Sequence, residues 1–280
     1  MSNIMLKLKK IASLKKMPIN DLRIIVAIER IIARLESDPD LSEHLIFKGG
    51  FVLLKTLFSS RFTRNIDALA EGIDKNRIIN CIPDILRRDL KDGFWYGDIK
   101  LQMLEEQGKY GGIRFDCAFQ IDEIPEDNQV KKLSRLHLDV GFGDVIPKNI
   151  NPINMDSLIE TNNPISWSIY PLEFIFSEKL QTIVERGSAN SRAKDVFDLV
   201  ILYDAISNKN EIFSALNKTF QNRQTSFPHS FADYLKTIDT SLVKLSWNSV
   251  ALSVDNSIDF EHAWKKLTKI VEELDSLLMK

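Results

Sequence analysis

The sequence predicts an α+β protein, with a strand-rich N-terminal part and a helical C-terminal part. Apolar and polar side chains alternate between residues 95 and 137, a pattern typical of half-buried antiparallel strands. Residues 22–35 instead carry apolar side chains at helical spacing, and the chain after Pro171 is mostly helical in pattern. Both kinds of element are therefore present, and they are separated along the chain.

The passage from Pro147 to Pro164 separates the two parts. It contains three prolines and many Asn, Asp and Ser residues, which favour turns and irregular backbone. We therefore expect one domain over residues 1–150 and a second, mainly helical domain over residues 151–280. A chain of 280 residues is long enough for two closely packed domains.

The first elements are predicted from the spacing of apolar residues and from the residues that interrupt helices and strands. The helix over residues 22–35 has Asp21 as its expected cap and ends near Ser37. A short apolar strand at residues 45–47 stops at two glycines, and residues 51–58 have helical character. A strand that carries Asn65 and Asp67 follows.

The later elements are predicted in the same way. Residues 74–89 fit a helix, and the charged stretch at 122–132 fits a loop between two strands. The next strand places Asp139 on its polar face, because side chains on a strand alternate between faces. Residues 171–184 fit a helix, and residues 191–204 fit another that Asn190 or Ser191 would cap.

Composition excludes several classes of protein. A net charge of −2 and a pI near 6.1 argue against a wholly basic nucleic-acid-coating protein. The broken apolar pattern of the N-terminus does not resemble an export signal, and no stretch is apolar for long enough to span a membrane, so we expect a cytoplasmic protein. Cys81 and Cys117 lie in apolar patterns, which favours reduced thiols. A basic helix face near the N-terminus is a solvated surface or an RNA contact, and its residues are Lys7, Lys9, Lys10, Lys15 and Lys16.

The stretch from Phe47 to Ala70 carries the chemistry. A Gly-Gly pair lets backbone amides approach a phosphate at a helix N-terminus. Asn65 and Asp67 are two residues apart on a strand, so their side chains project to one face and can hold a cation. The order strand, glycine turn, helix, strand predicts the front half of a nucleotidyl-transfer site.

Four segments resemble the AbiEii nucleotidyltransferase toxins: KGGFVLLK, RFTRNIDALA, LDVGFGDVIP and YPLEFIFSEKLQTIVERGSANSRAKDVFDL. The resemblance implies a polymerase-β-like fold, with a mixed sheet in the N-terminal part and helices in the C-terminal part. It also implies transfer of a nucleotide from a nucleoside triphosphate to an acceptor, which in the related MenT toxins is the 3′ end of tRNA. We accordingly expect an RNA acceptor, tRNA, together with an antitoxin encoded nearby and a role in growth arrest or phage defence.

By this resemblance, Asp67 and Asp139 are metal ligands and Asn65 is a weakened third ligand. The expected ion is Mg²⁺ or Mn²⁺, since nucleotidyl transfer builds up negative charge that a cation stabilises, and such cations prefer oxygen ligands. Asp67 is also expected to be catalytic.

Other residues match the family positions that bind the nucleotide. Lys48, Gly49 and Gly50 correspond to the glycine turn that cradles the triphosphate. Arg61 and Thr63 precede the Asn65 strand, where they could contact phosphate oxygens or simply be solvated.

The last segment adds a second group. Lys179 is expected to reach the triphosphate or the leaving pyrophosphate as a point charge. Lys194 and Asp198 are four residues apart, a spacing that alone predicts an ordinary helical ion pair. In the family this segment lies at the active site, so Lys194 is a nucleotide-binding candidate, and Asp195 and Asp198 are candidates for activating the acceptor hydroxyl or orienting Lys179.

Asn65 departs from the family's Asp-x-Asp pattern, because an amide offers a neutral oxygen where the family has an anionic one. A natural weakening, a natural pseudoenzyme and an introduced inactivating substitution all fit this departure. The alternative function is therefore a catalytically inactive nucleotide- or RNA-binding protein that acts through a partner. A third alternative is kinase-like phosphoryl transfer to a protein.

Overall fold

The structure is a computed structural model that describes residues 4–59, 61–107, 110–148, 150–160, 163–251 and 259–278. The chain divides into two compact units. Unit 1 contains Met1–Phe51, Thr63–Gly143 and Lys148–Ile169, and unit 2 contains Val52–Phe62, Asp144–Pro147 and Tyr170–Lys280. The expected division into domains at residue 150 stays a prediction.

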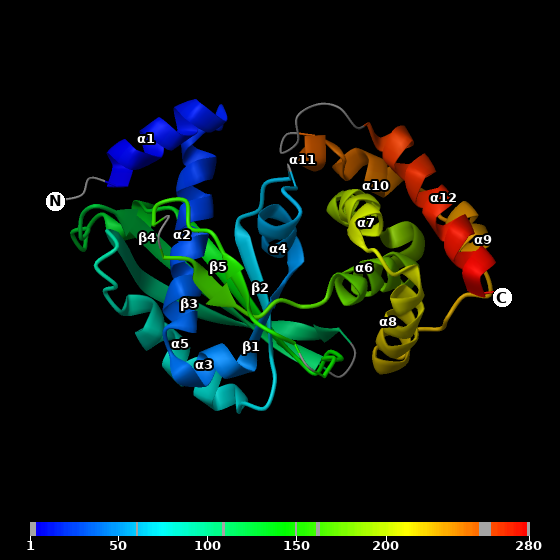
Figure 1. Cartoon of the computed structure of the whole chain (residues 1–280), viewed down its shortest axis with the longest axis horizontal. Helices are drawn as coiled ribbons and strands as arrows, with labels where there is room; N and C mark the ends of the chain where they lie inside the picture. The colour runs from blue at the N-terminus through cyan, green and yellow to red at the C-terminus, as the bar shows by residue number, and fades with distance from the viewer. Residues whose placement is uncertain are drawn as a thin grey trace. The chain divides into compact units, whose positions relative to one another are not determined.

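Unit 1 is built on a mixed sheet, as the resemblance implied (Figure 1). In the described residues its strand order is β1-β2-β5-β4-β3. β2 and β5 are parallel, and the other neighbours are antiparallel. The strands are β1 (Leu45–Lys48), β2 (Asn65–Ala70), β3 (Phe94–Gln107), β4 (Tyr110–Ile121) and β5 (Arg135–Phe142).

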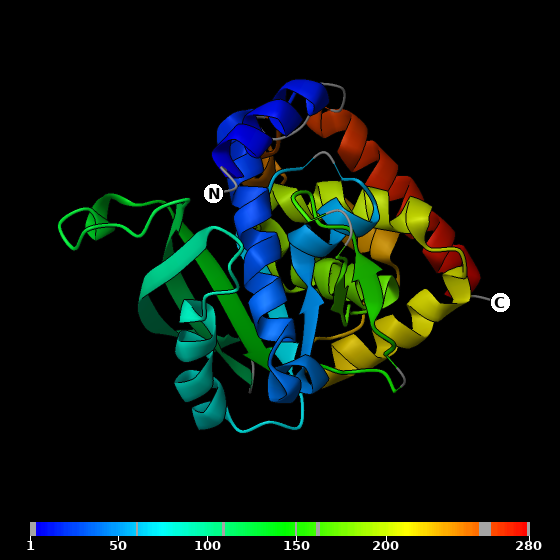
Figure 2. The same cartoon turned by 60° about the vertical axis from the view of Figure 1, so that its left-hand side comes forward.

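Helices of unit 1 precede or connect these strands. The 3-10 turn η1 (Val130–Lys132) lies in the predicted loop between β4 and β5, which projects away from the sheet in Figure 2. β6 (Ile153–Met155) lies in the passage that the sequence predicted as irregular, and it pairs in a small two-stranded sheet with β7 (Ile165–Trp167), which directly follows that passage. The helices are α1 (Ile4–Lys15), α2 (Ile19–Glu36), α3 (Pro39–His44), α4 (Gly49–Thr56) and α5 (Lys75–Arg87). α4 begins in unit 1, and its residues from Val52 onward are assigned to unit 2.

The expected cap of α2 was wrong. Pro18 is the N-cap residue and makes no side-chain cap bond, so Asp21 lies inside the first turn. There its carboxylate still interacts favourably with the positive end of the helix dipole. The cap of α7 was also wrong, because Arg192 occupies that position, while Asn190 Oδ1 accepts a hydrogen bond from the Arg192 amide at 2.9 Å.

The sheet has one apolar and one polar face. Leu136, Leu138 and Val140 of β5 are buried, whereas the alternate residues of that strand are partly exposed. α2 lies on the apolar face, where the hydroxyl of Tyr96 on β3 donates to the Ala27 carbonyl at 2.6 Å. The opposite face contains Asn65 and Asp67 of β2 and Asp139 of β5, all of them partly exposed.

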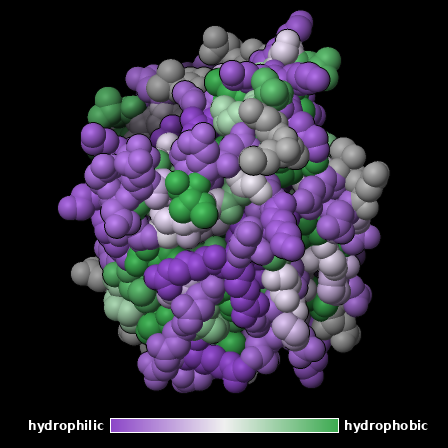
Figure 3. All heavy atoms as spheres, turned by 90° about the vertical axis from the view of Figure 1, so that its left-hand side faces the viewer, coloured by the Kyte–Doolittle hydropathy of each residue, from purple (hydrophilic) through white to green (hydrophobic). Residues whose placement is uncertain are grey.

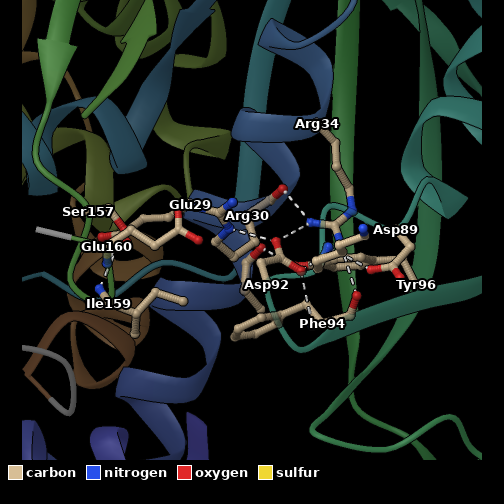
Figure 4. A network of polar contacts seen from close by, with 12 residues as sticks. Glu29, Arg30, Arg34, Asp89, Asp92, Phe94, Tyr96, Ser157, Ile159 and Glu160 are labelled. Carbon is tan, nitrogen blue, oxygen red and sulfur yellow. Dashed lines mark hydrogen bonds and ion pairs between the residues drawn. The ribbon is translucent and has the colours of Figure 1, made fainter. Parts of the chain in front are cut away.

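A buried ionic cluster ties α2 to the start of β3 (Figure 4). Arg34 donates to both oxygens of Asp92, at 2.7 and 3.0 Å, and Arg30 donates to one of them at 2.7 Å. Burial raises the pKa of Asp92, but the hydrogen bonds and charges of Arg34 and Arg30 outweigh it and hold the pKa below its usual value. This cluster fixes the helix against the sheet that carries the polar face.

Unit 2 is helical in its described residues, as the sequence predicted. α6 contacts both α7 and α8, and α12 packs against α7 and α9. A 3-10 turn, η2 (Gly187–Ala189), links α6 and α7. The helices are α6 (Leu172–Arg186), α7 (Ala193–Ala205), α8 (Lys209–Asn222), α9 (Phe231–Lys236), α10 (Ser241–Ser246), α11 (Asn248–Ala251) and α12 (Phe260–Leu278).

The surface and the thiols agree with the composition. Hydrophilic residues cover most of the face drawn in Figure 3, and hydrophobic residues form separate small groups on it. Within the described residues, none of the helices is long and apolar enough to cross a membrane. Cys81 and Cys117 are free, and burial raises the pKa of Cys117 to about 12. Burial also raises the pKa of Cys81, so both thiols are protonated at neutral pH.

Candidate active site

The glycine turn joins β1 directly to α4. β1 ends at Lys48 and α4 begins at Gly49, whose φ of +77° lies in the region that favours glycine. The first backbone amides of a helix have no partner inside that helix, and its N-terminus attracts anions. Gly49 and Gly50 therefore present backbone donors at a position suited to a phosphate.

Gly49 also lies against the Asp67 carboxylate. A Cβ atom built on Gly49 would overlap the Oδ2 and Cγ atoms of Asp67. Lys48 is the cross-strand partner of Asp67, and Gly49 is the next residue along the chain. The glycine therefore lies beside Asp67. The missing side chain at position 49 is what lets the Asp67 carboxylate lie beside the helix N-terminus.

Asp67 and Asp139 are register partners on parallel neighbouring strands, β2 and β5. Such partners are about 4.8 Å apart across a sheet and project to the same face. Asn65 lies two residues before Asp67 on that face, where its own register partner is His137. The sheet thus brings together the three residues that the sequence predicted as metal ligands.

Thr63 sets the start of β2. Its hydroxyl oxygen accepts a hydrogen bond from the Asn65 amide at 3.3 Å, and the residue is buried. This local bond fixes the backbone just before the Asn65 side chain. The predicted contact of Thr63 with phosphate stays a prediction.

Arg114 is a residue of this face that the sequence reading missed. It is the cross-strand partner of Asp139 on β4, and its Nε and Nη2 donate to the two Asp139 oxygens, each at 2.7 Å. The bond to Asp139 raises the pKa of Arg114, burial opposes this, and the charges of Asp139, Asp67 and Asp116 raise the pKa further. Strand alternation could have placed Arg114 on the polar face, but the sequence did not show which strand pairs with β5.

A second polar row lies beside the first. Asp116 is the register partner of His137, and its Oδ1 accepts from Arg135 Nε at 2.7 Å. Arg135 also donates from Nη1 to Asp98 at 2.7 Å. His137 Nε2 is 3.6 Å from Asp116 Oδ1. The polar face therefore carries paired charges well beyond the predicted ligands.

The donor set suits one hard cation. Two carboxylates and one amide oxygen face the same side of the sheet, and Mg²⁺ is commonly held by one or two carboxylates plus substrate phosphates and water. Among the residues that the structure describes, no group of three or more His, Cys, Asp or Glu is arranged to hold a metal. The residues present thus fit a cation that shares its ligands with a bound triphosphate.

Four of the remaining predicted residues, Arg61, Lys179, Asp195 and Asp198, form a buried cluster in unit 2. Arg61 donates from Nε and Nη2 to the two oxygens of Asp198, at 2.7 and 2.8 Å. Lys179 Nζ lies 2.8 Å from an oxygen of Asp198 and 2.8 Å from an oxygen of Asp195. Arg192 makes a further ion pair with Asp195. The structure brings Arg61, Lys179, Asp195 and Asp198 together within this unit.

The pKa values of this cluster follow from its pairing. Burial lowers the pKa of Lys179, but Asp195 and Asp198 outweigh it and raise the pKa above its usual value. Burial raises the pKa of Asp195, but Lys179 and Arg192 outweigh it and hold the pKa below its usual value. Both groups therefore stay charged at neutral pH.

Lys194 lies apart from these pairs on an exposed position of α7. Partial desolvation, followed by the charge of Arg61, lowers its pKa. Asp198, four residues later, is committed to Arg61 and Lys179. The bidentate geometry of Arg61 on Asp198 is that of a structural pair, so its predicted phosphate contact stays a prediction.

Solved structures with a similar fold include two from Helicobacter pylori. One is the protein JHP933, which is 16% identical, with a TM-score of 0.53 over 93% of this chain and 94% of that one. The other is a putative nucleotidyltransferase, 17% identical, with a TM-score of 0.54 over 93% and 96% of the two chains. No curated protein sequence matches the chain. The chain thus shares its fold with these two proteins.

Residues 30–269 match the family described as nucleotidyl transferase AbiEii toxin, type IV toxin–antitoxin system. This match covers most of the chain, and the chain belongs to the AbiEii family. It is therefore a nucleotidyltransferase of a toxin family, for which the class implies a nucleoside triphosphate, a divalent metal ion and a cognate antitoxin.

Proposed function

We propose that this protein transfers a nucleotide from a nucleoside triphosphate to the 3′ end of an RNA, with tRNA as the acceptor and Mg²⁺ or Mn²⁺ as the cofactor. The single observation that carries the proposal is the position of Asp67. Its carboxylate lies against Gly49 at the start of α4 and is the register partner of Asp139 on β5. A phosphate-binding helix terminus and a pair of cation ligands thereby meet at one residue.

Asp67, Asp139 and Asn65 would hold the cation, and the amides of Gly49 and Gly50 would hold phosphate oxygens. Lys48 would add a positive charge on the strand beside Asp67. The bound cation would neutralise the charge that develops on the transferred phosphate. The chain's own residues would orient the triphosphate. Orientation and charge stabilisation supply most of the catalysis in this class of reaction, because the reaction needs no covalent intermediate with the protein.

In unit 2, we propose that Lys179 contributes positive charge toward the leaving pyrophosphate, and Lys194 toward the nucleotide. Asp195 is ionised and paired, so its role is to orient Lys179. Asp198 holds Arg61 and Lys179 in the same way. Activation of the acceptor hydroxyl by either aspartate would require it to give up one of these pairs.

The test is incorporation of α-labelled nucleotide, with each triphosphate in turn, into total RNA in Mg²⁺ or Mn²⁺. We expect label in RNA of tRNA size, and its loss when periodate oxidation has destroyed the 3′ hydroxyl group of the RNA. Asp67→Asn should abolish incorporation without lowering the thermal unfolding midpoint by more than a few degrees. Label from the γ phosphate in protein would instead indicate a kinase.

Asn65 favours one alternative, a nucleotide-binding protein without catalysis. The Asn65→Asp variant separates the two functions in the same assay. Label with the wild type or with this variant supports the transferase. Absence of label with both, while nucleotide still binds, would replace the proposal by the binding protein.

A further inference from the structure

Arg114 gives the polar sheet face a positive charge of its own. Asp67, Asp139 and Arg114 form one row across β2, β5 and β4, because each is the register partner of the next. The Arg114 guanidinium donates a hydrogen bond to each Asp139 oxygen, at 2.7 Å in both cases. Two parallel hydrogen bonds between oppositely charged groups are the strongest geometry that such a pair can adopt.

The charges of the row decide how many cations it can hold. Two carboxylates and one guanidinium leave a net charge of −1, since Asn65 contributes a neutral oxygen. A second divalent cation, bound at Asp139, would have to take an oxygen that Arg114 already uses, and it would also lie beside a fixed positive charge. The pair with Arg114 does not involve Asp67, which lies on the far side of Asp139 from β4.

We propose that Arg114 takes the place of a second cation and limits the site of Asp67, Asp139 and Asn65 to one divalent ion. Asp67 holds this ion most strongly, together with the triphosphate, and Asp139 is the weaker ligand because Arg114 already uses both of its oxygens. The inference depends on the function proposed above, because it concerns the same carboxylates. Arg114 is a positioning residue: it determines the charge available at Asp139 and does not contact the reacting atoms.

Arg135 provides a matched control on the same face. Its side chain is 21% exposed, against 29% for Arg114, and it also makes charged hydrogen bonds across strands. Its partners are Asp116 and Asp98, which lie outside the row of Asp67 and Asp139. Loss of Arg135 therefore disturbs this face of the sheet without releasing Asp139.

The experiment counts Mn²⁺ bound per chain, by electron paramagnetic resonance of the free ion, in the presence of a triphosphate whose α,β bridge is methylene. We expect one Mn²⁺ for the wild type and for Arg135→Gln. We expect Arg114→Gln to bind two Mn²⁺ ions. The dissociation constant of its second ion should be at least tenfold lower than that of any second ion bound by the wild type. Arg114→Met retains the aliphatic stem and should give the same result as Arg114→Gln. Thermal unfolding verifies that each variant is folded.

Two further outcomes are separable. Asp67→Asn is introduced alone and together with Arg114→Gln. If neither chain loses Mn²⁺ binding relative to its parent, the cation does not bind at Asp67, and both the proposed cation site and the inference are wrong. If the wild type binds one Mn²⁺ that Asp67→Asn abolishes, but the Arg114 variants also bind one, the site stands and the inference is overturned. Two Mn²⁺ on the wild type would overturn it as well.

Discussion

The Asp67 carboxylate lies against the Cα of Gly49, at a spot that a Cβ atom on residue 49 would occupy. The contact joins two elements that the chain separates by 17 residues, the start of α4 and the middle of β2. Gly49 also has a φ of +77°, which other residues adopt only with strain. Gly49 therefore has two roles: it allows the backbone turn, and it leaves space for the Asp67 carboxylate.

Gly49→Ala should weaken cation binding as well as stability. The new methyl group pushes the Asp67 carboxylate away from the helix terminus, so we expect at least a tenfold loss of Mn²⁺ affinity. The backbone strain adds a cost of about 1–2 kcal/mol in the free energy of unfolding. Gly72→Ala is the control, because Gly72 has a φ of +69° and its added Cβ atom would approach His44. It should lose similar stability and retain cation affinity; equal affinities in the two variants would contradict the assigned role of Gly49.

Asn65→Asp should strengthen the cation site. The substitution adds a negative charge two residues from Asp67 on the same face. We expect at least tenfold tighter Mn²⁺ binding, equivalent to about 1.4 kcal/mol, and faster nucleotide transfer. Asn65→Ala is the comparison, since it removes the amide oxygen and should weaken binding. If calorimetry gave the same affinity for all three chains, Asn65 would not be near the cation.

The sequence predicted the fold class and the residues of the sheet face, because both depend on short-range pattern. Alternation in residues 135–142 was enough to place Asp139 on a polar face, and the structure confirms that pattern of burial. Pairing between strands depends on long-range contacts, so the sequence could not show that Arg114 lies opposite Asp139. For the same reason Arg61 was predicted as a phosphate contact or a solvated residue, because its partner Asp198 is 137 residues away in the sequence.

Asp198→Ala should destabilise unit 2 strongly. Asp198 is fully buried and pairs with two cations, Arg61 and Lys179, which are nearly buried themselves. Removal of the acid leaves both cations underpaired, and breaking a buried pair in this way costs about 3–5 kcal/mol. Urea unfolding measures this loss. The control is Asp233→Asn, in the exposed pair with Lys236, which should leave the midpoint unchanged. Equal midpoints for the two variants would show that the cluster does not contribute to stability.

Glu36 should make unit 1 less stable as the pH rises. It lines a cavity of about 660 Å³ at the end of α2, and its Oε1 atom is buried without a hydrogen-bond partner in the described residues. Desolvation by burial raises the pKa of Glu36 to about 8, whereas an unfolded glutamate titrates near 4.5.

Between these two pKa values the folded chain binds more protons at Glu36 than the unfolded chain does. The contribution of this group to stability therefore falls as the pH rises from about 4.5 to 8, and stays constant above that range. Glu36→Gln removes the cost of burying a charge, so urea unfolding should show a more stable chain than the wild type at pH 8.5 and a smaller difference at pH 5. Glu43→Gln, an exposed residue that lines the same cavity, controls for the loss of a surface charge. A constant difference between Glu36→Gln and the wild type at both pH values would mean that Glu36 does not change its protonation on unfolding.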